Sequence, residues 1–181
     1  KDAPRLLLEA ELRPVQGDRF QPTGFPDLGA ARYRRPDGKE MLLVESAQSV
    51  ANRLERTILK GEGPHLDDDL KGLPYIHVKL TGLVDSETSS LVEAHRINSP
   101  FIISDERFQA AFIDLAGYAE GRPIDWHKVA SAFLRLDPNS LIHGAFLANL
   151  RDGRIRTPRM LTGFVEAEDV RGERREADGS D

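Results

Sequence analysis

The chain has 181 residues, of which 39% are hydrophobic and 30% are charged, and its formal net charge is −5. This length and composition are typical of one globular domain with a substantial core. No apolar run approaches the roughly 20 residues that a membrane helix needs, and no cysteine is present. A membrane span, disulfides, cysteine-bound zinc and a thiol nucleophile are therefore excluded. The first residues lack the long apolar stretch of a signal peptide, so we expect a cytoplasmic protein.

Positive charge is concentrated in two separate segments, although the chain is acidic overall. Residues 1–60 carry a net charge of +2 and residues 151–165 carry +3, whereas residues 61–150 carry −6 and residues 166–181 carry −4. Most of the cations are arginine, which favours planar, bidentate contacts with phosphate. The charge pattern leaves two alternatives open, namely solvated protein faces or surfaces that bind phosphate groups.

Alternation, turn residues and caps predict the elements of the first hundred residues. These elements are a strand over 5–14, a loop rich in glycine and proline over 15–31, a hairpin turning at Asp37-Gly38, a helix over 47–60, a strand over 75–80 and a helix over 88–98. Ser46 is the expected N-cap of the first helix, and Gly61 is expected to end it.

Amphipathic helices dominate the next part of the chain. The predicted elements are a helix from Asp105 to Tyr118, a helix from Asp125 to Leu136, an apolar segment over 141–147, a strand with one arginine face over 151–165 and a flexible charged tail over 166–181. The residues expected to face the core are Phe108, Ala111, Phe112 and Leu115 on the first helix, and Trp126, Val129, Phe133 and Leu136 on the second. Strands flanking a helical insert indicate an α+β fold rather than an alternating parallel sheet.

Sequence motifs of catalysis and metal binding are missing from the chain. It holds no phosphate-binding loop, dinucleotide fingerprint, zinc-protease motif or nucleophile elbow. The five histidines do not fall at metal-ligand spacings, and Glu93 and His95 would point in different directions from a helix. We therefore predict no catalytic residue, no metal ligand and no cofactor.

Three segments combine groups that can contact phosphate or stack on bases. They are the loop residues Arg19, Phe20, Gln21 and Thr23; the helix-start residues Ser46, Gln48, Ser49, Asn52 and Arg53; and the strand residues Arg154, Arg156 and Arg159. Aromatic rings beside arginine suit single-stranded nucleic acid, and a helix start with hydroxyl and amide groups suits phosphate. Arg53 and Arg156 are expected to act on one RNA backbone.

Five long strings resemble one protein family. They are 19–31 (RFQPTGFPDLGAA), 43–55 (LVESAQSVANRLE), 91–102 (LVEAHRINSPFI), 139–147 (NSLIHGAFL) and 154–168 (RIRTPRMLTGFVEAE). The family is the CRISPR-associated backbone subunit of type I-G effector complexes, formerly called type I-U, within the RAMP superfamily. The strings span most of the chain in the family's order.

The resemblance implies an RRM-like or ferredoxin-like palm with inserted helical fingers and a thumb hairpin. On this basis, residues 1–104 would hold the N-terminal part of the palm, 105–150 the helical insert, 151–165 a returning core strand and 166–181 the start of the thumb. The family's proteins are longer, so we expect a fragment or a chain broken at a mobile loop, with the remaining core strands beyond it.

The resemblance also implies a function without catalysis. Several copies would stack along one CRISPR RNA, present it for pairing with target DNA and contact other subunits of the effector complex in antiviral defence. The expected RNA-binding set then includes His95 and Arg96 besides the three segments above. Two alternatives stay open: a metal-independent ribonuclease of the same superfamily that uses His95 or His77, and an interaction module that binds no nucleic acid.

Overall fold

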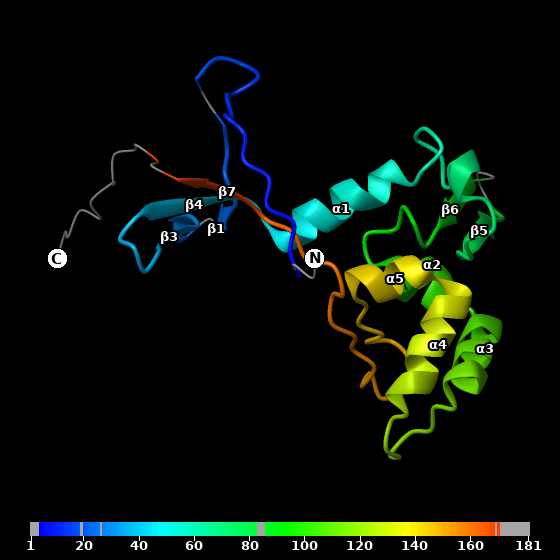
Figure 1. The fold of residues 1–181 in the computed structure, drawn as a ribbon. Helices are drawn as coiled ribbons and strands as arrows, with labels where there is room; N and C mark the ends of the chain where they lie inside the picture. Colours follow the sequence, from blue (N-terminus) through cyan, green and yellow to red (C-terminus); the bar gives the residue numbers. More distant parts are fainter. Residues whose placement is uncertain (1–3, 19, 26, 83–85, 169, 171–181) are drawn as a thin grey trace. The chain divides into compact units, whose positions relative to one another are not determined.

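The computed structural model describes residues 4–18, 20–25, 27–82, 86–168 and 170. The chain divides into two compact units, one made of residues 1–45 with 165–181 and the other of residues 46–164. Helices and small antiparallel sheets together make an α+β fold (Figure 1), which confirms the predicted fold class. The described strands form sheets of two, three and two strands, so the ferredoxin-like palm stays a prediction.

The smaller unit is built on a three-stranded antiparallel sheet. Its strands follow the order β3 (Arg32–Arg34), β4 (Glu40–Glu45) and β7 (Val165–Glu168). Two shorter strands, β1 (Gly24–Phe25) and β2 (Gly29–Ala30), pair with each other. The pairing of β4 with β7 joins segments that lie far apart in the sequence.

The turn between β3 and β4 is the one predicted at Asp37-Gly38. Gly38 has a φ of +87°, a conformation that glycine adopts without steric cost. The Asp37 carboxylate accepts a hydrogen bond from the Lys39 amide at 3.1 Å, which fixes the turn. Residues 5–14 are described in full but form no strand. Their side chains are exposed, so no packing partner holds them in a sheet.

The larger unit holds the helices and one hairpin. Its elements are α1 (Ala47–Thr57), β5 (His77–Leu80), β6 (Ser86–Ser89), α2 (Pro100–Ile103), α3 (Glu106–Ala116), α4 (Trp126–Leu136) and α5 (Pro138–His143), with 3-10 turns at Asp68–Leu70 and Arg96–Asn98. Polar side chains cap the longer helices as predicted: Ser46 accepts from the Ser49 amide at 3.3 Å, and Asp105 and Asp125 cap α3 and α4.

The core of the larger unit lies between α3 and α4. Phe112 and Phe133 are fully buried, and their rings meet edge to face with centroids 5.2 Å apart. Further buried residues surround this pair: Ile97, Ile102, Ile103, Ala116, Val129, Ala132, Leu147, Leu150 and Ile155. The apolar spacing of the two predicted helices therefore located most of the core correctly, but two of the residues expected to face it, Ala111 and Trp126, are exposed. Trp126 is 50% exposed because it begins α4, one turn before the part that packs on α3.

Besides the strand over 5–14, two predicted elements are wrong. Residues 88–98, predicted as a helix, begin in strand β6, whose Thr88 and Ser89 pair with β5, and end in a 3-10 turn. Residues 151–164, most of the segment predicted as a strand over 151–165, are irregular, with one isolated bridge between Phe146 and Arg156, and Val165 begins strand β7. Pro158 lacks the N–H that a longer ladder would need.

The boundaries of the units follow from the packing. The helices over 105–150 bury their apolar faces against Ile97 and Ile155, so they form one compact unit with the flanking segments. The expected division into palm, helical insert and thumb stays a prediction. Part of the tail predicted as flexible, residues 166–168, belongs to β7, and residues 169 and 171–181 lie outside the described part. None of the helices in the described segments is long and apolar enough to cross a membrane.

Candidate nucleic-acid interface

The larger unit contains a pocket of about 560 Å³ that gathers residues from four parts of the sequence. It is lined by the first turn of α1, the turn before α2, the end of α5 with the segment after it, and the segment 156–159. Its polar lining residues are Gln48, His95, Arg96, Asn98, His143, Asn149, Arg156, Thr157 and Arg159. Within the described part of the chain, no Asp or Glu lines this pocket, although the protein as a whole is acidic.

Backbone contacts at the end of α5 fix one wall of the pocket. Gly144 has a φ of +78°, and a Cβ at this position would lie 3.0 Å from the Thr157 carbonyl oxygen. Only glycine lets the segment 157–159 approach this closely without strain. The Met160 amide donates to the Ile142 carbonyl at 2.9 Å, and the Thr157 hydroxyl accepts from the Ala145 amide at 3.0 Å. These bonds hold the arginine-bearing segment against α5.

Two arginines of this wall present cationic groups to the pocket. The Arg156 guanidinium lies over the Phe146 ring, 5.6 Å from its centroid, and the Phe146 side chain is about half exposed. The Arg159 guanidinium donates to the Gln48 side-chain oxygen, and the Gln48 amide donates to Asn52 Oδ1 at 2.8 Å. An arginine stacked on an exposed ring can contact a phosphate while the ring accepts a base. The start of α1 and the segment 156–159 thus meet at one site.

A buried ion pair lies beneath the pocket. Arg96 Nη2 donates to Glu55 Oε2 at 2.8 Å, and its Nε donates to Glu55 Oε1, with both side chains less than a tenth exposed. Asn139 Nδ2 donates to the same carboxylate at 2.7 Å. The Glu55 carboxylate compensates the charge of Arg96, and this ion pair stabilises the pocket wall. The RNA contact expected of Arg96 stays a prediction.

His143 lines the pocket, and its side chain is nearly fully buried. Burial lowers the pKa of its imidazole; the Glu55 carboxylate partly opposes this shift, and the Arg96 and Arg159 guanidiniums add to it. A neutral imidazole at neutral pH keeps one acceptor nitrogen. His143 Nδ1 is among the buried polar side-chain atoms of the described residues that have no hydrogen-bond partner.

The remaining predicted residues of α1 occupy its first two turns. Ser46 is the N-cap, and its hydroxyl oxygen accepts from the Ser49 amide. Asn52 accepts from Gln48, and Arg53 is exposed on the helix surface. Gln48 is the α1 residue that lines the pocket. The common action of Arg53 and Arg156 on one RNA backbone stays a prediction.

The predicted loop residues belong to the smaller unit. Phe20 and Gln21 are exposed, with 53% of Phe20 accessible. Thr23 is half-buried, and its hydroxyl donates to the Val44 carbonyl at 3.1 Å, so it fastens the loop to β4. Arg19 lies outside the described residues.

Arg154 is held away from the pocket lining. Its Nε contacts Asp152 at 2.5 Å, its Nη1 donates to the Arg122 carbonyl at 3.1 Å, and its guanidinium lies over the Tyr118 ring. These contacts fasten the irregular segment to the turn between α3 and α4. Arg154 and Arg156 are both exposed on either side of the buried Ile155, but only Arg156 lines the pocket.

Among the lining residues that sequence reasoning missed are the polar Asn98, His143, Asn149 and Thr157 and the aromatic Phe146. Phe146 carries the one local signal that could have found the site, since it is an exposed aromatic residue between the buried Ala145 and Leu147.

A family model described as CRISPR-associated protein GSU0053 (Cas_GSU0053) matches residues 6–172 of the chain. No curated protein matches the chain.

Proposed function

The chain belongs to the CRISPR-associated protein GSU0053 family, and from this premise we propose that it is a non-catalytic subunit that holds CRISPR RNA. Copies of the subunit would stack along one guide RNA in a type I effector complex and present it for pairing with target DNA. Other subunits of the complex would cap this filament. The resemblance to the backbone subunit of type I-G complexes supports this role.

The observation that carries the proposal is the pocket over α5. It combines Arg156 stacked on Phe146, Arg159 beside the start of α1, and a lining without carboxylates among the described residues. Guide sequences vary, so such a subunit must hold phosphates and sugars rather than read bases. Guanidinium groups and an exposed ring supply contacts of this kind.

The competing function is a metal-independent ribonuclease that uses His95. This histidine is exposed and lines the same pocket, within reach of any RNA that binds there. General acid–base cleavage needs a second proton-transferring group beside the scissile phosphate. His143 also lines the pocket, so it is the candidate for this second group beside His95.

We expect the protein to bind unrelated single-stranded RNAs of equal length with dissociation constants that agree within about tenfold, or about 1.4 kcal/mol. One base-specific bidentate contact would separate them by about 1–3 kcal/mol. Fluorescence anisotropy with several labelled sequences measures this difference. A strong preference for one sequence would contradict the proposal.

The same samples distinguish the two functions when they are resolved by gel after long incubation. RNA of unchanged length agrees with a holding role. Shortened RNA whose formation is abolished in the His95→Ala variant would establish the nuclease instead.

A further inference from the structure

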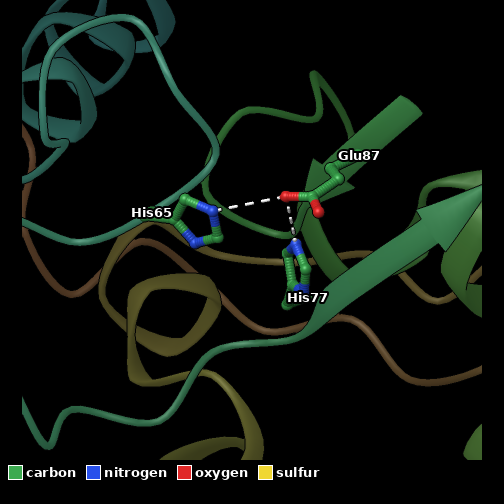
Figure 2. A group of neighbouring side chains, drawn as sticks. All are labelled: His65, His77 and Glu87. Carbon is green, nitrogen blue, oxygen red and sulfur yellow. Dashed lines mark hydrogen bonds and ion pairs between the residues drawn. The ribbon is translucent and has the colours of Figure 1, made fainter. Parts of the chain in front are cut away.

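A second polar cluster lies outside the pocket, on the hairpin β5–β6. It consists of His65, His77 and Glu87, and Figure 2 shows both imidazoles directed at one carboxylate. His65 Nε2 lies 3.3 Å from Glu87 Oε2, and His77 Nε2 lies 3.1 Å from the same oxygen. One ligand atom from each residue lies within 4.8 Å of the other two. In the described part of the chain, this is the one group of three such side chains so close together.

The backbone brings the three residues together from separate segments. His77 on β5 pairs with Ser89, and Lys79 pairs with Glu87 on β6, so His77 and Glu87 are diagonal neighbours on one face of the hairpin. His65 comes from the loop after α1. The Lys60 amide donates to the His65 carbonyl at 2.9 Å, and Leu59 bridges to Leu66, which closes that loop.

A fourth residue orients His65 for this arrangement. The Tyr75 hydroxyl lies 3.0 Å from His65 Nδ1, on the side of the ring opposite the carboxylate. When Nδ1 donates its proton to the Tyr75 hydroxyl, Nε2 is left as the ligand atom. The His65 and His77 rings lie 4.9 Å apart and tilted by 38°, so both nitrogens can converge on a common point.

The ligand set matches a borderline transition-metal ion. Zinc takes imidazole nitrogen and carboxylate oxygen at about 2.0–2.2 Å, and ligand atoms of a tetrahedral ion then lie about 3.3 Å from one another. The two nitrogen-to-oxygen separations already have this value. Two imidazoles disfavour Mg²⁺ and Ca²⁺, which take oxygen ligands.

We propose that His65, His77 and Glu87 form a Zn²⁺ site that fastens the loop after α1 to the β5–β6 hairpin. The side chains are between a quarter and a half exposed, so solvent can reach the ion and supply the fourth ligand. The site is separate from the pocket over α5, and it does not depend on RNA binding.

The test uses the full chain freed of metal with a chelator and then titrated with Zn²⁺ alone. We expect one ion per chain by calorimetry and by metal analysis after desalting. We expect His77→Ala and Glu87→Gln to weaken Zn²⁺ binding at least tenfold. The matched control is His127→Ala, which removes an exposed histidine at the start of α4 and should bind like the parent.

Two further measurements, thermal unfolding and Co²⁺ absorption, test the metal site independently of the titration. Circular dichroism shows whether each variant is folded, and the thermal midpoint should rise with Zn²⁺ in the parent and in His127→Ala only. Tetrahedral Co²⁺ absorption should appear in the parent and vanish in Glu87→Gln. No bound Zn²⁺, or equal binding by a folded His77→Ala variant, would overturn the proposal.

Discussion

Replacement of Arg96 by methionine should lower the free energy of unfolding of the larger unit by about 3–5 kcal/mol. The variant leaves the Glu55 carboxylate buried with the Arg96 guanidinium removed, while the Asn139 amide still donates to it. A buried charge without compensation is far more costly than the pair is stabilising. Urea denaturation followed by circular dichroism measures the loss.

The control for this prediction removes both charges. The double variant Glu55→Leu with Arg96→Met replaces the ion pair with apolar side chains, so it should recover most of the lost stability. If the single variant loses less than about 1 kcal/mol, the pair is not buried in solution and the account of the pocket wall is wrong.

Replacement of Phe112 by alanine should cost about 3–5 kcal/mol of stability. The side chain is fully buried and its ring packs edge to face on Phe133, so truncation leaves a cavity at the centre of the α3–α4 contact. The same denaturation experiment measures the effect.

The matched control is Phe101→Ala, since the Phe101 ring is 53% exposed and its loss opens no enclosed cavity. We expect this variant to lose much less stability than Phe112→Ala. Equal losses would contradict the assignment of the core. A stable Phe112→Ala variant that fails to bind RNA would place this helix in the interface instead.

Local signals in the sequence predicted the three longer helices α1, α3 and α4 and the first hairpin well. The caps Ser46, Asp105 and Asp125 and the turn at Asp37-Gly38 act through bonds to residues two or three positions away, so the sequence shows them directly. The apolar spacing that placed Phe112 in the core is equally local.

Features that depend on distant partners could not be predicted in this way. Thr88 and Ser89 belong to a strand because β5 pairs with them, although their own neighbourhood suggested a helix. The pocket exists because Gly144 lets the segment 157–159 pack on α5. The three ligands of the proposed zinc site come from a loop and two strands, at spacings that match no metal motif.

The two sites suit ligands of opposite charge. The pocket over α5 presents arginine to an anion, whereas the cluster at Glu87 presents a carboxylate and two imidazoles to a cation. Loss of Zn²⁺ should therefore leave the proposed RNA binding at Arg156 unchanged. This independence allows the failure of one proposal to be distinguished from the failure of the other.

The most direct test of the RNA-holding role is the salt dependence of RNA binding by the Arg156→Glu variant. Anisotropy titrations of one labelled RNA at several salt concentrations give the slope of log K against log salt for each protein. The control is Arg107→Glu, which reverses a charge at a side chain that is 93% exposed on α3, outside the pocket. The account predicts weaker binding and a slope shallower by about one ion for Arg156→Glu, with the slope of the control unchanged. Equal slopes for the parent and a folded Arg156→Glu variant would contradict it.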